Sequence, residues 1–154
     1  MLPSTVERVR SNTADNVNQR ISQQTIASVS HHGRGGADAI ERRLRELDAE
    51  WDIERLLETN AASVSLIGLA LGATVDRRWF VLPAAVAGFL LQHALQGWCP
   101  PLPLFRRLGI RTASEIDEER YALKAMRGDF QIFDLESDDD HARLSQKAVC
   151  AAQI

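Results

Sequence analysis

Cysteine is scarce in this sequence. Cys99 and Cys150 are the only two among 154 residues. This number excludes a disulfide framework, and no CxxC pair is present to form a zinc knuckle. The sequence therefore predicts no cofactor and no metal site. Cys99 is a weak candidate for a catalytic residue.

An apolar run is missing from the N-terminus. The first twenty residues, MLPSTVERVRSNTADNVNQR, are polar and charged, so no cleavable signal peptide is expected. An excess of positive charge is missing as well. The net charge is −3, which argues against a general nucleic-acid-binding protein.

Charge is absent from two neighbouring stretches. Residues 59–75 and 79–105 contain no Asp, Glu, Lys or Arg, and three charged residues, 76–78, separate them. At about 1.5 Å of rise per helical residue, residues 59–75 span roughly 25 Å and residues 79–98 roughly 28 Å. A bilayer core is about 30 Å thick. The pattern predicts a transmembrane helical hairpin over residues 59–99.

A soluble helical bundle is the alternative to this hairpin. Two apolar helices can also be buried in the core of a soluble protein. A soluble helix, however, normally carries a polar face, and neither stretch has one over its central turns. The sequence therefore favours the membrane hairpin.

The tryptophans lie near the ends of the apolar segments. Trp79 and Trp98 bracket the second segment, and Trp51 precedes the first. Tryptophan favours membrane interfaces because it combines an apolar ring system with a polar N–H group. These three residues are predicted to be interface anchors.

Small residues recur at a spacing of four in both segments. Gly68 and Gly72 form a GxxxG motif in the first segment, and Ala84 and Gly88 repeat the spacing in the second. Small side chains allow helices to approach closely in lipid. These four positions are predicted to be where the two helices pack.

Three polar side chains occur near the end of the second segment. Gln92, His93 and Gln96 are predicted to be polar residues within the membrane. Such residues usually face another helix or water and can mark a functional site. The pattern favours hydrogen bonding between helices. Cys99 is not at a recognised zinc spacing from His93, so no metal site is predicted.

The segments before the hairpin are polar. Residues 1–36 are predicted to be a weakly helical or disordered arm, rich in Ser, Thr, Asn and Gln. Residues 37–58 are predicted to be an amphipathic helix, with Asp38 as its cap and Glu41 as the reciprocal partner. That helix lies either on the membrane surface or against a soluble partner.

The segments after the hairpin begin with prolines. Residues 100–130 are predicted to be a Pro-rich turn and a helix that a capping box opens at Thr112 and Glu115 and that Gly128 ends. Residues 131–154 are predicted to be an acidic, mobile tail. The expected fold class is all-α: a membrane hairpin with amphipathic cytoplasmic helices before and after it.

Arginines near the hairpin indicate its orientation, because cytoplasmic flanks carry more positive charge. The connecting loop has only Arg77 and Arg78. Both termini are therefore expected in the cytoplasm. The flanking residues that support this are Arg42, Arg43, Arg45 and Arg55 before the hairpin and Arg106, Arg107, Arg111 and Arg120 after it.

A short segment after the second helix carries a family resemblance. Gly97-Trp98-Cys99-Pro100, followed by Leu108-Gly109-Ile110-Arg111-Thr112, resembles the end of the small two-helix membrane domain of the YgaP-type inner-membrane rhodanese family. That domain also occurs as a stand-alone bacterial protein. The resemblance covers about residues 55–115. It implies a hairpin in the bacterial inner membrane with cytoplasmic ends, and only Cys99 is a residue to which a sulfur-transfer role carries over.

Three functions are consistent with these patterns. The leading hypothesis is a non-enzymatic bacterial inner-membrane protein that anchors or scaffolds a partner. The second is a membrane accessory of persulfide transfer that uses Cys99. The third is a soluble helical interaction protein. The expected partners are the lipid bilayer and either a second copy of the chain or another membrane or cytoplasmic protein, with no nucleic acid.

Overall fold

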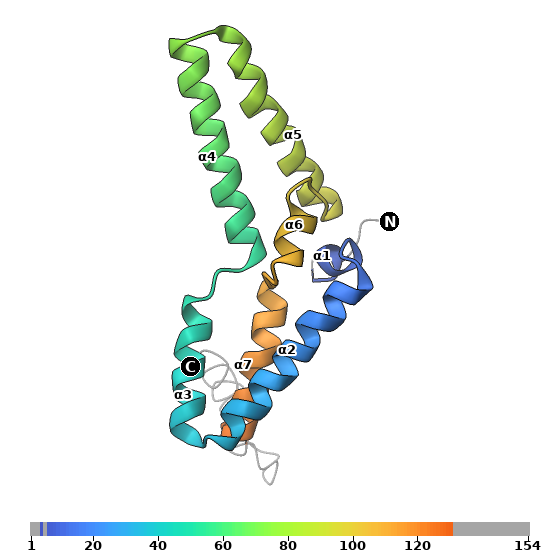
Figure 1. The fold of residues 1–154 in the computed structure, drawn as a ribbon, viewed down its shortest axis with the longest axis vertical. Coiled ribbons are helices and arrows are strands. Elements are labelled where there is room, and N and C mark those ends of the chain that lie inside the picture. Colours follow the sequence, from blue (N-terminus) through green and yellow to red (C-terminus); the bar gives the residue numbers. More distant parts are fainter. Residues whose placement is uncertain (1–3, 5, 131–154) are drawn as a thin grey trace, which may run out of the picture.

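The computed structural model describes residue 4 and residues 6–130, and all regular secondary structure in that part of the chain is helical. Figure 1 shows a long helical hairpin projecting from a group of helices at its foot. The elements are α1 (Arg8–Ser11), α2 (Asp15–Arg34), α3 (Ala37–Ala49), α4 (Ile53–Thr74), η1 (Arg77–Phe80), α5 (Val81–Gln96), α6 (Leu102–Arg107) and α7 (Ala113–Arg127).

Three helices, α2, α3 and α7, pack on one another and are called the base below. The arm predicted to be weakly helical or disordered contains the 20-residue helix α2, whose Val17 and Ile21 are buried. A polar sequence of this kind is marginal as an isolated helix. Packing against α3 and α7 supplies the stabilisation that its intrinsic propensity lacks.

The single helix predicted over residues 37–58 is two helices in the structure. α3 ends at Ala49, Glu50 is extended, and the Asp52 side chain accepts a hydrogen bond from the backbone N–H of Arg55 to begin α4. The cap predicted at Asp38 is wrong. Gly36 holds the N-cap position with φ 77°, so Asp38 already lies in the first helical turn and makes no capping hydrogen bond.

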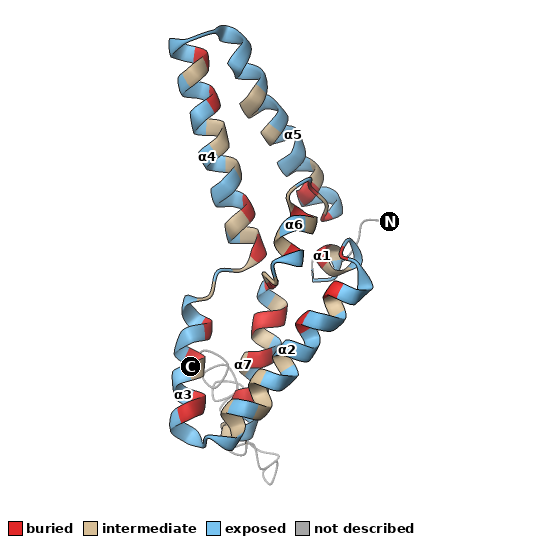
Figure 2. Cartoon of the chain, in the orientation of Figure 1, coloured by how far each residue is buried: buried red, intermediate tan, exposed pale blue. Residues whose placement is uncertain are grey.

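The apolar face of α3 packs within its own chain. Ile40, Leu44 and Leu47 form a buried cluster with Ile116 and Leu123 of α7. Figure 2 shows buried residues on both α3 and α7. Neither a membrane surface nor a separate partner is needed to cover this part of the helix.

The start and end of α7 confirm the sequence pattern. The Thr112 hydroxyl accepts a hydrogen bond from the Glu115 backbone N–H at 3.2 Å, and the Glu115 carboxylate accepts one from the Thr112 N–H at 2.9 Å. Gly128 follows the helix with φ 92°, a conformation that favours glycine. The predicted acidic tail, residues 131–154, lies outside the described residues.

Candidate membrane hairpin and the clusters at its foot

The hairpin of α4, η1 and α5 is apolar and exposed. The stretches Ala37–Thr74, which contains α4, and Arg77–Gln96 are long and apolar enough to cross a membrane, and only 22% and 6% of their apolar windows are buried. A core helix of a soluble protein would be mostly buried, whereas these stretches leave a large apolar surface uncovered. Figure 2 shows exposed residues along both legs of the hairpin. They include Leu66, Ile67, Val75, Val81, Leu91 and Leu95.

The two legs of the hairpin meet closely at the glycines of α4. A Cβ atom at Gly68 would lie 2.7 Å from Pro83 Cδ, and one at Gly72 would lie 2.7 Å from Phe80 Cδ1. Both distances are too short for non-bonded carbon atoms. Gly68 and Gly72 are therefore where α4 accommodates the opposite leg, as the GxxxG spacing predicts.

The small residues of α5 do not contribute to this contact. A Cβ atom at Gly88 would meet no other atom within 4 Å, and Ala84 is exposed. The prediction that these two residues pack against α4 is wrong. The larger side chains Leu82 and Pro83 contact α4 instead, because the glycines on α4 already provide the space.

The three tryptophans occupy different environments. Trp51 and Trp79 are exposed, and the Arg55 guanidinium lies 4.4 Å from the ring centroid of Trp51. Trp98 is half-buried and packs against a core cluster at the foot of the hairpin. Two of the tryptophans predicted as interface anchors are thus free to contact a membrane surface, and the third is also part of the protein core.

An arginine, a carboxylate and a histidine join α1 to both legs of the hairpin. Glu54 accepts a hydrogen bond from Arg8 Nη2 at 3.1 Å, and its other oxygen lies 2.8 Å from His93 Nε2. Arg8 also donates to the Ala94 carbonyl. His93 is buried, and its Nδ1 has no partner among the described residues. The contact with Glu54 gives His93 a structural role, because it joins α5 to α4.

The two glutamines near His93 do not form a shared site with it. Gln92 is half-buried and Gln96 is exposed. The Gln96 backbone carbonyl accepts a hydrogen bond from Asn12 Nδ2 at 2.8 Å. Neither glutamine side chain forms a hydrogen bond with another described residue, so the three polar residues do not converge.

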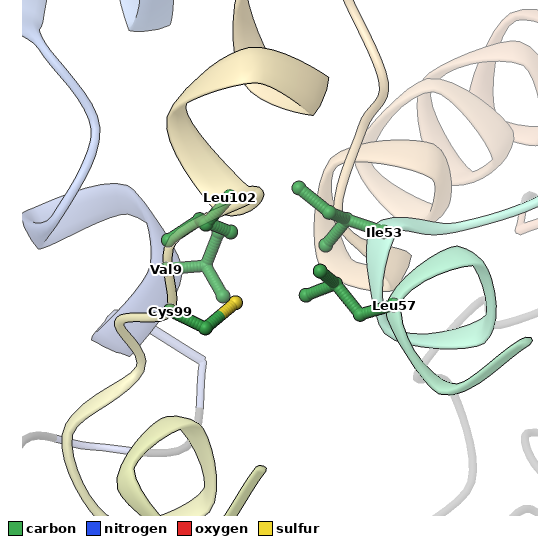
Figure 3. Close-up of a cluster of buried hydrophobic side chains, with 5 residues drawn as sticks. All are labelled: Val9, Ile53, Leu57, Cys99 and Leu102. Atoms are coloured by element: carbon green, nitrogen blue, oxygen red, sulfur yellow. The ribbon is translucent and has the colours of Figure 1, made fainter. Parts of the chain in front are cut away.

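Cys99 lies in the core at the foot of the hairpin. Figure 3 shows it with Val9, Ile53, Leu57 and Leu102, and its sulfur is directed toward the α4 residues. The side chain is only 4% exposed. Burial raises the pKa of the thiol, the hydrogen bond with the Leu102 backbone opposes that rise, and the nearby Glu54 carboxylate adds to it. The thiolate that nucleophilic chemistry requires is therefore disfavoured.

A small cavity opens beside Cys99 between α4 and α5. Its volume is about 170 Å³, below the roughly 300 Å³ at which typical small-molecule sites begin. Almost all of its lining is apolar. The residues around it are Leu57, Asn60, Ala61, Val64, Val86, Phe89, Leu90, Cys99, Pro100 and Pro101.

Arg106, the first arginine after Cys99 in the sequence, pairs with a carboxylate of α7. Arg106 is buried and forms a two-pronged ion pair with Glu115, with N–O distances of 2.6 and 2.8 Å. It also donates to the Thr13 hydroxyl. Burial alone would raise the pKa of Glu115, but hydrogen bonds from Arg106 and Thr112 hold it below its usual value.

A second buried ion cluster lies inside the base. Glu119 accepts hydrogen bonds from Arg43 Nε at 2.8 Å, from Arg111 Nη1 at 2.5 Å and from the Ser28 hydroxyl at 2.5 Å. Burial alone would raise the pKa of Glu119, but these hydrogen bonds lower it to about 2. Arg111 also pairs with Glu50, next to the break between α3 and α4. The cluster therefore ties all three helices of the base together.

These two ion clusters were not predicted from the sequence, because arginine and glutamate side chains are usually exposed. The sequence did contain one signal for the burial of Glu119. This residue follows Ile116 by three positions and precedes Leu123 by four, so it lies on the apolar face of α7. An acidic residue on an apolar helix face requires a buried partner.

Among the described residues, no group of three or more His, Cys, Asp and Glu side chains is arranged to hold a metal ion. Comparisons of the chain with protein-family models, with curated proteins and with solved structures give no match.

Proposed function

We propose that this chain is a bacterial inner-membrane protein whose hairpin spans the bilayer and whose base serves as a cytoplasmic anchor or scaffold for a partner. One observation carries the proposal: two apolar helices project from a charged base and leave most of their surface uncovered. Exposure of that surface to water is unfavourable, whereas lipid covers it without cost. The helical backbone satisfies its own hydrogen bonds, as a spanning segment must.

The proposed orientation places both termini in the cytoplasm. It follows from the arginines on the two flanks of the hairpin, compared with Arg77 and Arg78 in the loop. Several flanking arginines, such as Arg43 and Arg106, form ion pairs in the folded protein. The positive-inside rule counts arginines by their position near the ends of the membrane segments, and their pairing in the folded protein does not enter that count. The YgaP-type resemblance around Cys99 supports the same orientation.

The scaffold role is favoured over persulfide transfer by the surroundings of Cys99. The thiol is buried, its pKa is raised, and the adjoining cavity is small. Two buried ion clusters, in contrast, fix the helices below the hairpin: one joins α6 to α7, and the other joins the three helices of the base. A fixed helical base on a membrane hairpin suits a protein that positions a partner at the membrane.

The membrane part of the proposal is tested by washing membranes with alkaline carbonate. The wild-type protein is expected to stay in the membrane fraction. The exposed hairpin residue Ile67 is replaced by Arg, and the exposed base residue Ile26 by Arg as the matched control. Ile67→Arg is expected to lower membrane retention, because a charge at mid-membrane is costly, and Ile26→Arg to leave it unchanged. Recovery of the wild-type chain as a soluble protein without detergent overturns the proposal.

The orientation is tested with reporters fused to each end of the full chain. One reporter is active only in the cytoplasm and the other only in the periplasm. Cytoplasmic activity is expected at both ends. A periplasmic signal from either end contradicts the hairpin or its orientation.

A further inference from the structure

The tip of the hairpin carries two arginines beside exposed apolar side chains. Arg77 and Arg78 begin η1, and all residues from 73 to 81 are exposed. Trp79 and Phe80 follow directly, each with more than two fifths of its surface exposed. Figure 1 shows this tip at the end of the molecule opposite the base.

The two tip arginines have no acidic partner among the described residues. Asp76 is the only acidic residue between Glu58 and Glu115. Its carboxylate accepts a hydrogen bond from the Arg78 backbone N–H at 2.8 Å and so caps η1. Neither guanidinium forms an ion pair in the described part of the chain, which contrasts with the paired Arg106 and Arg111 below the hairpin.

The backbone of the tip is fixed by its contacts with α4. The Phe80 ring lies against Gly72, and the Asp76 N–H donates to the Leu71 carbonyl at 3.1 Å. These contacts hold the start of η1 over the end of α4. Arg77 and Arg78 are therefore presented from a defined turn.

The length of the hairpin places this tip at the opposite headgroup layer if the hairpin spans the bilayer. Arg77–Gln96 has 20 residues, which is about 30 Å of helix and matches a bilayer core of about 30 Å. Guanidinium groups bind phosphate oxygens through paired hydrogen bonds, and tryptophan favours the same depth.

We propose that Arg77 and Arg78 bind the phosphate groups of anionic phospholipids in the leaflet opposite the base. This inference rests on the proposed membrane function and names the partner of the hairpin tip. Charge complementarity carries it, since two cations without acidic partners in the described part of the chain face a layer of phosphates. The aromatic side chains beside them fix the depth at which the contact forms.

The test measures lipid binding at the tip of the full chain in vesicles. Trp51→Phe and Trp98→Phe leave Trp79 as the only tryptophan. Its quenching by brominated phosphatidylglycerol and by brominated phosphatidylcholine gives the preference of the tip for the anionic lipid. Replacing Arg77 and Arg78 with Gln is expected to lower that preference by about five-fold for each arginine removed, the effect typical of a basic residue near an anionic membrane.

The matched control replaces Arg34 and Arg42 with Gln, because these exposed base arginines also form no ion pair with another described residue. It is expected to leave the preference unchanged. Inorganic phosphate at matched ionic strength is expected not to reduce quenching, which separates lipid headgroups from free phosphate. Circular dichroism checks that each variant keeps its helix content.

Two outcomes overturn the inference, and they are distinguishable from failure of the proposed function. If the Arg77→Gln, Arg78→Gln variant keeps the preference for anionic lipid, the two arginines do not bind the lipid phosphates. That result does not contradict the membrane hairpin. Stronger quenching by bromines near the ends of the lipid acyl chains than by those near the headgroup would place the tip in mid-bilayer. That result also contradicts binding of the arginines to lipid phosphates. Release of the wild-type chain by carbonate is a separate result, and it would contradict the proposed membrane function.

Discussion

At the scale of single residues, Cys99 decides between the two membrane hypotheses. Its side chain is buried among apolar residues, and burial raises its pKa. In a Cys150→Ser background, alkylation of Cys99 near neutral pH is expected to be slower in the folded protein than in the same variant unfolded in guanidinium, because the thiolate is the reactive form. The measurement is the alkylation rate as a function of pH. Rapid labelling of the folded protein, together with a persulfide found by mass spectrometry, would favour sulfur transfer.

Glu119 is the residue on which the stability of the base depends most directly. It is buried and accepts hydrogen bonds from Arg43 and Arg111. Glu119→Gln is expected to lower the free energy of unfolding by about 3 kcal/mol, because it leaves two buried cations without their shared anion. The neighbouring Glu118, which is exposed, provides the control: Glu118→Gln should change stability by less than about 0.5 kcal/mol. Chemical denaturation in detergent measures both, and equal effects would contradict the role of the cluster.

The same carboxylate makes stability depend on pH. The pKa of Glu119 is about 2 in the folded protein, compared with an ordinary value of 4.5. A lowered folded-state pKa stabilises the protein fully above the unfolded value, and this stabilisation is lost as the pH falls toward the folded value. The melting temperature is therefore expected to fall between about pH 5 and about pH 2, and to fall less in Glu119→Gln. Parallel pH curves for the two proteins would exclude Glu119 as a cause.

At the scale of the elements, the packing of α4 on α5 depends on the glycines of α4 and not on Gly88 of α5. Gly72→Ile is expected to destabilise the hairpin by about 1–3 kcal/mol, the usual cost of overpacking, since its side chain would meet the Phe80 ring. Gly88→Ile faces open space and is expected to have no comparable effect. Thermal unfolding in detergent compares the two. A larger loss from Gly88→Ile would mean that its face packs against another surface.

The break between α3 and α4 separates the two parts of the protein. It occurs where Asp52 caps α4 and where the Glu50 side chain pairs with Arg111. A continuous helix over these residues would have carried the axis of α3 directly into the hairpin. The break instead lets α3 pack on α7 while α4 leaves the base.

At the scale of the whole molecule, orientation in the membrane sets which arginines a protease can reach. If the termini are cytoplasmic, trypsin added outside spheroplasts has targets only after Arg77 and Arg78 at the tip. In inverted vesicles, exposed base arginines such as Arg34 and Arg42 become accessible. Fragment masses report the sites. Base peptides released from intact spheroplasts would contradict the proposed orientation.

The sequence by itself determined the features that local patterns encode. Two stretches without charge gave the apolar hairpin, and the capping box at Thr112 together with Gly128 gave the bounds of α7. The GxxxG spacing located the glycines where the legs meet. These patterns could be predicted because hydropathy and helix capping act between residues a few positions apart.

Only the tertiary structure decided which charged and small side chains are buried. Arg43 and Glu119 are 76 residues apart, and Arg106 and Thr13 are 93 apart. The first contact depends on how α3 packs on α7, and the second on how α6 lies against the segment before α2. No local sequence pattern shows which residue is the partner in either pair. For the same reason Gly88 is exposed while Gly72 is buried, since the rotation of each helix about its axis is set by the side chains it meets across the interface.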